Sequence, residues 1–194
     1  MTGLRTALAL CAALILAGCY PPTTSRPVGT TAGLRNDPAL TGTWRTLPLA
    51  DDRGGTYFHF LPEGDDRFVV AVVPAHGEAG DLVVATVSSA RYGRFGFLNA
   101  RLLETAGKRE SEQPPGTVPI LYRFDAKGVL SLAMMDEDAT KAAIRAHKIA
   151  GSAGKAGTDD ATITADSRTL DKFLSSPAGQ ALFAKPFGVM KKVD

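Results

Sequence analysis

Seven short apolar segments, separated by turn-forming residues, follow one another between residues 42 and 135. They cover residues 42–47, 56–61, 68–73, 82–87, 95–103, 120–124 and 129–135. Within the second segment, Phe58 and Phe60 alternate with Tyr57 and His59, which is the period of a strand with one buried face. Short strands at a spacing of about ten residues are typical of an antiparallel meander. We therefore expect a mainly β fold, a barrel or sandwich of about 7–9 strands.

The C-terminal third has a helical pattern instead. Asp136 can cap a helix that runs to about Ala146, and Asp166 can cap a second helix. Ser176 followed by a proline predicts the start of a third short helix. We expect these two or three helices to form a plug or a brace on the sheet, and residues 187–193 to add a final edge strand.

The first nineteen residues resemble an export signal. Arg5 supplies positive charge, residues 7–16 are continuously apolar, and small residues follow. A membrane-spanning helix needs about 20 apolar residues, and the polar residues from Pro21 onward end this run too early. We therefore expect cleavage of the segment.

The end of this segment, Leu16-Ala17-Gly18-Cys19, resembles the lipobox of bacterial lipoproteins. The resemblance implies cleavage after Gly18 and a diacylglyceryl (and further acyl) group on Cys19, which would anchor the protein to a membrane. Tyr20 is not the aspartate that resembles an inner-membrane retention signal, so we expect the outer membrane, facing the periplasm. The layout also resembles uncharacterised lipoproteins of proteobacteria, a resemblance that brings no activity with it.

Three regions follow from this pattern. Residues 1–18 are expected to be a cleaved signal peptide, and residues 19–37, rich in Pro, Thr and Gly, a flexible tether. Residues 38–194 are expected to form a single β-rich domain. The net charge of +2 and the lack of a basic stripe argue against nucleic acid as a partner. Cys11 would leave with the signal, so Cys19 would be the last thiol and would carry lipid.

The sequence contains no motif of a known catalytic or metal site. His59, His76 and His147 are not in a ligand spacing, and the acidic pairs fall where turns and helix caps favour Asp. Residues 149–156 fail the phosphate-loop pattern, because Ile149 stands where Gly is required and Ala156 follows Lys155. We expect no cofactor and no metal; the alternative is a hydrolase site in which His59 or His76 meets a carboxylate only in three dimensions.

Gly42-Thr43-Trp44 resembles the Gly-x-Trp of lipocalins, in which the tryptophan closes one end of a barrel. The helices after Met135 depart from the lipocalin order, and a core tryptophan on a first strand explains the same residues without a ligand. If the resemblance holds, a pocket for a small apolar ligand could include Trp44, Tyr57 and His59. The expected function is therefore a lipid-anchored, non-enzymatic binding or protein-interaction module, with an apolar-ligand carrier as the alternative.

Overall fold

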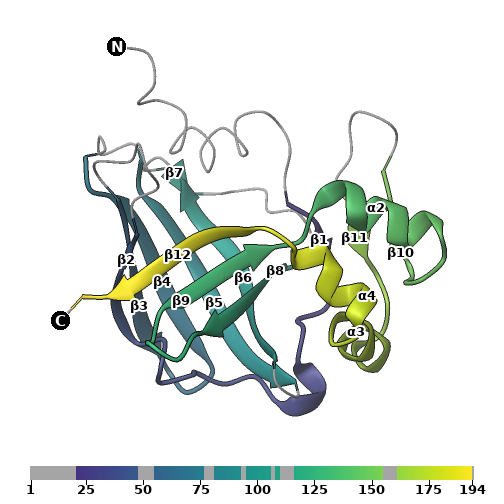
Figure 1. The fold of residues 1–194 in the computed structure, drawn as a ribbon, viewed down its shortest axis with the longest axis horizontal. Helices are drawn as coiled ribbons and strands as arrows, with labels where there is room; N and C mark the ends of the chain where they lie inside the picture. The colour runs from purple at the N-terminus through teal and green to yellow at the C-terminus, as the bar shows by residue number, and fades with distance from the viewer. Residues whose placement is uncertain are drawn as a thin grey trace, which may run out of the picture.

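A closed antiparallel barrel is the centre of the fold (Figure 1). The computed structural model describes residues 21–47, 55–76, 81–92, 95–105, 108–109, 116–154 and 161–193. Within these ranges, eight strands pair in the order β5-β4-β3-β2-β12-β9-β8-β6, and β6 pairs with β5 to close the ring. The strands of the ring are β2 (Gly42–Thr46), β3 (Thr56–Glu63), β4 (Arg67–Pro74), β5 (Val83–Tyr92), β6 (Phe95–Thr105), β8 (Val118–Phe124), β9 (Leu130–Met134) and β12 (Pro186–Lys192). The short β7 (Lys108–Arg109) pairs with the end of β6.

The strand alternation in the sequence decides which side chains enter the barrel. Trp44 lies opposite Phe58, and Phe58 lies opposite Val72, so all three point to the same side of the sheet. The neighbouring residues Tyr57 and His59 point to the other side. The structure thus confirms the mainly β prediction and shows a barrel rather than a sandwich.

The last strand is not the edge strand that the sequence predicts. β12 pairs with β2 on one side and with β9 on the other. The first and last strands of a seven-stranded meander each keep one unpaired edge, and β12 fills the gap between them. The C-terminal segment therefore closes the barrel.

The helices pack on the outside of the barrel as a brace, not inside it as a plug. They are α2 (Glu137–Arg145), α3 (Ser167–Leu174), α4 (Pro177–Gln180) and the 3₁₀ turn η3 (Ala181–Phe183). The side chains of Asp136, Asp166 and Ser176 accept hydrogen bonds from the first turns of α2, α3 and α4, as the sequence predicts. Leu170, Leu174 and Phe183 form a second hydrophobic core with outward-facing Phe97 and Leu121 of the barrel.

The segment expected to be a flexible tether is packed against the domain over its described part, from residue 21 onward. Strand β1 (Thr23–Thr24) joins a small sheet with β11 (Thr162–Ile163) and β10 (Gly151–Ser152), and the short 3₁₀ turn η1 (Thr30–Ala32) follows. Val28 is fully buried, and its N–H and C=O are both bonded by the side chain of Asn99, at 2.6 and 2.9 Å. The Pro, Thr and Gly content of this segment predicted a tether, since composition does not reveal backbone hydrogen bonds to distant side chains.

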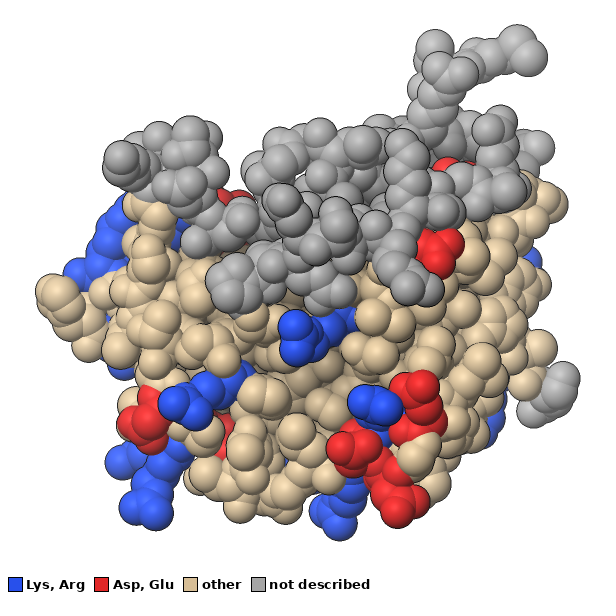
Figure 2. Space-filling model, turned by 180° about the vertical axis from the view of Figure 1, so that it is seen from behind, with Lys and Arg blue, Asp and Glu red and all other residues tan. Residues whose placement is uncertain are grey.

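The charged side chains on the face seen in Figure 2 are mixed in sign. Lys and Arg lie among Asp and Glu, and most of the visible surface between them is uncharged. The described residues of this face therefore form no extended patch of one charge.

Candidate functional site

One half of the barrel interior is densely lined by buried side chains. We call it the sealed half, and its buried residues are exposed by 4% or less. They are Trp44, Phe60, Phe68, Val70, Val87, Leu98, Tyr122, Leu130, Leu132 and Met190, covered by Leu40. Phe124, beside Trp44, also faces inward at this end and is partly exposed. Four of the eleven buried residues are aromatic, and aromatic side chains fill much of the space.

The inward-facing residues of the other half are all partly exposed. We call it the accessible half; its residues are Thr46, Phe58, Val72, Val83, Ala85, Ala100, Leu102, Val118, Ile120 and Met134. A side chain inside a filled core is shielded on every side, so partial exposure of an inward side chain means that solvent reaches it. All of these residues except Thr46 are apolar. The accessible half is therefore an apolar lining of the barrel interior that solvent reaches, packed on one side against the buried core.

The separation between the halves follows the barrel axis on each strand. On β3, Phe58 is partly exposed and Phe60 is buried; on β6, Ala100 is partly exposed and Leu98 is buried. On every strand that contributes to both halves, the accessible positions lie toward the end at which β6 stops and β8 starts. An eight-stranded barrel is just wide enough to be filled by side chains or to hold one small ligand. Here the sealed end is filled by side chains, whereas the inward side chains of the other end are less completely covered.

Trp44 and the chain before β2 close the sealed end. The indole N–H of Trp44 donates to the carbonyl of Leu40 at 2.7 Å, and Leu40 is fully buried. The ring of Trp44 also lies 5.8 Å from that of Phe124. The residues before β2 thus form a lid that the barrel's only tryptophan holds in place.

A polar cluster fixes the same lid to the barrel wall. One carboxylate oxygen of Asp37 accepts from the hydroxyl of Tyr122 at 2.7 Å and from Nη2 of Arg91 at 2.9 Å. Burial by itself would raise the pKa of Asp37, but the hydrogen bonds from Tyr122, the Ala39 N–H and Arg91 hold it below its ordinary value. Burial raises the pKa of Tyr122, and the hydrogen bond to the charged Asp37 raises it further. Asp37 is therefore charged and Tyr122 neutral at pH 7.

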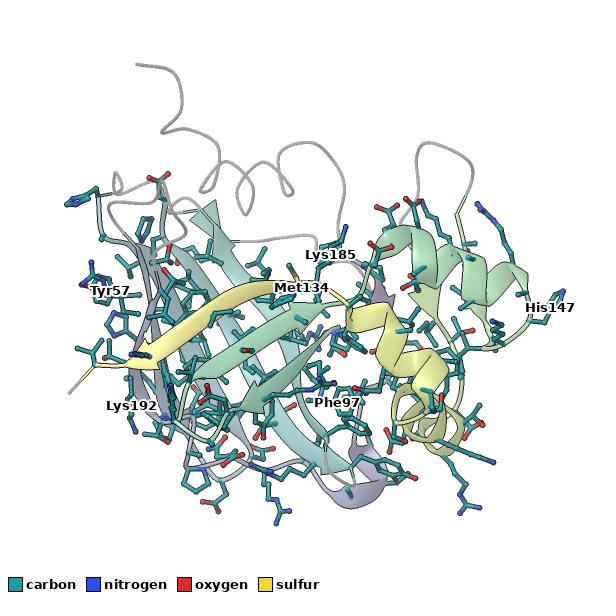
Figure 3. All side chains as sticks on the ribbon, in the orientation of Figure 1. Tyr57, Phe97, Met134, His147, Lys185 and Lys192 are labelled. Carbon is teal, nitrogen blue, oxygen red and sulfur yellow. The ribbon has the colours of Figure 1, made fainter. Side chains whose placement is uncertain are left out.

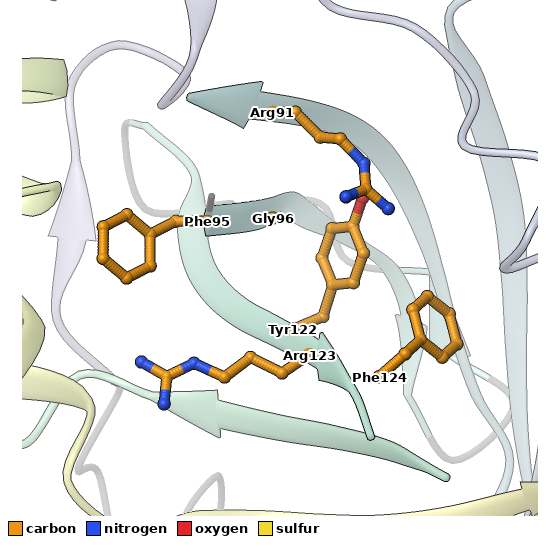
Figure 4. Close-up of a pocket in the computed structure, with 6 residues that line it drawn as sticks. All are labelled: Arg91, Phe95, Gly96, Tyr122, Arg123 and Phe124. Atoms are coloured by element: carbon orange, nitrogen blue, oxygen red, sulfur yellow. The ribbon is translucent and has the colours of Figure 1, made fainter. Parts of the chain in front are cut away.

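A pocket of about 480 Å³ lies at the sealed end of the barrel (Figure 4). Its lining residues are Arg91, Phe95, Gly96, Tyr122, Arg123 and Phe124. The guanidinium of Arg91 is paired with Asp37, and that of Arg123 donates to Gln180 at 2.8 Å. Both cations are thus engaged by other side chains. We regard it as a surface hollow and the accessible half as the stronger candidate site.

The structure does not bring the three predicted pocket residues together. Trp44 lies inside the barrel, whereas Tyr57 and His59 lie on its outer face, where their rings stack 6.4 Å apart. His59 Nδ1 is hydrogen-bonded to the hydroxyl of Thr43 at 3.0 Å. Successive residues of a strand point to opposite sides of the sheet. Trp44 is paired with Phe58, so the next residue, His59, lies on the other side of the barrel wall and cannot line the same pocket.

The histidines lie on separate surfaces of the described chain. His59 is on β3 beside Tyr57, His76 is exposed after β4, and His147 follows α2 on the far side of the molecule (Figure 3). Among the residues that the structure describes, no three His, Cys, Asp or Glu side chains are grouped so as to hold a metal ion. The same residues include no helix with the length and hydropathy needed to cross a membrane.

The lipid-attachment residue and its motif, Leu16 to Cys19, lie outside the described residues.

The residues of the accessible half were not predicted as a site. A usable signal was present, because Ala85 and Ala100 are small residues at inward positions of two paired strands. Alternation alone predicted that they face a core, but not that space remains in front of them.

No protein-family model, no curated protein and no solved structure matches this chain.

Proposed function

We propose that this protein is a lipid-anchored component of the bacterial cell envelope that binds a small apolar ligand inside its barrel. The observation that carries the proposal is the partial exposure of inward-facing apolar side chains in the accessible half, beside a sealed half whose residues are buried. Binding sites for small molecules are concave, mostly apolar and largely preformed. The apolar, solvent-reached lining of the accessible half supports the proposal, because such a site would need few polar groups.

The lining of the accessible half limits the class of ligand. Phe58, Val72, Ile120 and their neighbours offer only apolar contacts, and Thr46 adds a single hydroxyl. Because an eight-stranded barrel is narrow, a slender ligand fits better than a broad one. We therefore infer an aliphatic chain or a similarly narrow apolar molecule, bound without chemical change.

The anchor is proposed from the motif that ends at Cys19. Two or more acyl chains hold a protein stably at a bilayer, whereas one chain does so only marginally. A binding module needs no catalytic residues, and the proposal assigns none. The proposed location is the outer membrane, with the domain in the periplasm.

Quenching of Trp44 tests the proposed ligand. The full chain carrying Cys19→Ser is titrated with dibromostearate, whose bromines quench tryptophan fluorescence at short range. Trp44 is the only tryptophan and lies opposite Phe58, at the boundary of the accessible half. We expect saturable quenching, and at least a tenfold loss of affinity, about 1.4 kcal/mol, in Ala85→Phe, which fills the space.

Ala71→Phe is the matched control, because Ala71 lies on the outer face of the neighbouring strand β4. It should bind as the parent does. Ala100→Leu provides a second filling variant if Ala85→Phe unfolds, and circular dichroism checks the fold of each. Absence of quenching, or equal quenching in the filled variants and the control, would overturn the proposed binding site.

Metabolic labelling tests the anchor separately. Cells that express the protein are given a palmitate analogue, and the wild type is compared with Cys19→Ser. We expect label only on the wild type, in the outer-membrane fraction. Equal labelling of the two proteins contradicts lipid attachment at Cys19.

A further inference from the structure

The N-terminal segment enters the domain beside the accessible half. The N–H of Thr24 donates to the carbonyl of Thr117, and the N–H of Thr117 donates to the carbonyl of Thr24, both at 2.9 Å. Thr24 is fully buried, and its hydroxyl lies 3.2 Å from that of Thr117. Thr117 directly precedes Val118, which lines the accessible half. The chain that follows Cys19 is therefore fixed at the accessible end of the barrel.

From Thr24 the segment runs along the barrel to the sealed end (Figure 1). It is bound on the way by Asn99, which bonds both backbone groups of Val28, and by Asp171, which accepts from the N–H of Gly29 at 2.6 Å. It pairs with Ser89 through the backbone of Arg35, and it ends at the polar cluster of Asp37. These contacts keep the segment on the barrel, so only the residues before Thr23 can act as a linker.

The length of that linker limits how the domain can sit on a membrane. Four residues lie between Cys19 and Thr24, and Pro22 among them is already buried, so the three steps from Cys19 to Pro22 span at most about 11 Å at about 3.6 Å each. The sealed end lies about 15 Å further along the barrel axis, because β8 rises about 3.3 Å per residue from Val118 to Phe124 and barrel strands are tilted by about 35–45°. A lipid on Cys19 would therefore hold the accessible end nearer to the bilayer than the sealed end.

We propose that the accessible half takes up an acyl chain of a membrane lipid directly from the leaflet that anchors Cys19. This inference rests on the proposed function and adds the ligand class and its route. Moving an aliphatic chain into water is unfavourable in proportion to the apolar surface that water then contacts. A barrel whose apolar end is held at the bilayer surface accepts the chain without that cost, and its narrow apolar interior fits one chain.

Brominated phospholipid tests the route. The full-length, lipidated protein is reconstituted into phosphatidylcholine vesicles with either brominated or unmodified acyl chains. Trp44 lies on the sealed side of the boundary between the two halves, so quenching requires an acyl chain inside the barrel. We expect at least a twofold fall in Trp44 fluorescence with brominated lipid, no fall in Ala85→Phe or Ala100→Leu, and the full fall in Ala71→Phe. Unchanged fluorescence in the wild type overturns the proposal.

A second measurement tests the orientation independently. Leu103→Cys places a thiol on the outer face of β6 near the accessible end, and Lys127→Cys places one in the β8–β9 turn at the sealed end. With a fluorophore on each thiol and a quencher on the lipid headgroups, we expect stronger quenching at position 103. Equal quenching, or stronger quenching at position 127, contradicts the orientation.

The two proposals can fail separately. If Cys19→Ser binds dibromostearate in solution but brominated phospholipid leaves Trp44 unquenched in vesicles, the direct route is wrong and the binding function stands. If neither lipid quenches Trp44, both proposals are wrong.

Discussion

The two halves of the barrel share the same strands and differ in how completely side chains fill them. Trp44, Phe60 and Phe68 fill the sealed half, and Leu40 covers it. At inward positions of the accessible half, β5 and β6 carry Ala85 and Ala100, which are too small to reach across the barrel. The comparison shows that one strand pattern can form a buried core at one end and a partly exposed apolar lining at the other. The size of the inward residues decides between them.

Matched phenylalanine truncations should show the largest difference between the halves. Phe68 is fully buried at the sealed end, whereas Phe58 is partly exposed at the accessible end. Phe68→Ala should lower the free energy of unfolding by about 3–5 kcal/mol, because it leaves a cavity in a packed core. Phe58→Ala should cost less than half as much, measured by urea denaturation without ligand. Equal costs would contradict the distinction between the halves.

Enlarging small residues on β6 should give the next largest difference. A Cβ at Gly96 would overlap the ring of Tyr122, so Gly96→Ala should destabilise by about 1–3 kcal/mol through overpacking. Ala100→Val faces the accessible half and should change the free energy of unfolding little. Both are measured by the same denaturation. A large cost for Ala100→Val would show that the accessible half is already filled.

The lid of the sealed end should respond to acid. The pKa of Asp37 is below its ordinary value of 3.8, so this carboxylate stabilises the fold above about pH 4, and the contribution is lost as pH falls through its folded pKa. Asp37→Asn should cost about 1–2 kcal/mol at pH 7, through weaker hydrogen bonds with Tyr122 and Arg91. The difference from wild type should shrink toward pH 3 in urea denaturation at each pH. A difference independent of pH contradicts a charged Asp37 in the lid.

The smallest effect is expected on the outer face of the barrel. Tyr57→Ala and His59→Ala alter side chains that lie outside the wall, so dibromostearate should quench Trp44 in these variants as in the parent. Their stability should change by about 0.5 kcal/mol or less, as for most surface substitutions. A clear loss of affinity would return these residues to the site that the sequence predicted.

The sequence predicted the strands well because each one shows a local pattern. The alternation at residues 57–60 and the turn at Asp125–Gly128 need no knowledge of distant residues, and the helix caps at Asp136 and Asp166 are equally local. Closure by β12 depends on two strands more than 50 residues away along the chain. Packing of residues 21–37 depends on single distant side chains such as Asn99 and Asp171, which no local pattern reports.

The candidate site was harder to predict than the fold. Trp44, Tyr57 and His59 were grouped because aromatic and imidazole side chains are common in binding sites, but strand alternation already separates Trp44 from the other two. The accessible half depends on how much volume remains beside Ala85, which pairs with Leu102, and Ala100, which pairs with Val87. That volume depends on how the strands close in three dimensions, and the sequence did not distinguish a barrel from a sandwich.

Methyl-resolved NMR of the Cys19→Ser chain with stearate tests the central claim most directly. We predict shift changes and ligand contacts at methyl groups of the accessible half, such as Val72, Ala85, Ala100 and Ile120, and none at Leu130 and Leu132 of the sealed half. Ligand contacts at the sealed half, or only at outer-face residues such as Leu61 and Val69, would contradict a barrel with one sealed and one ligand-binding end.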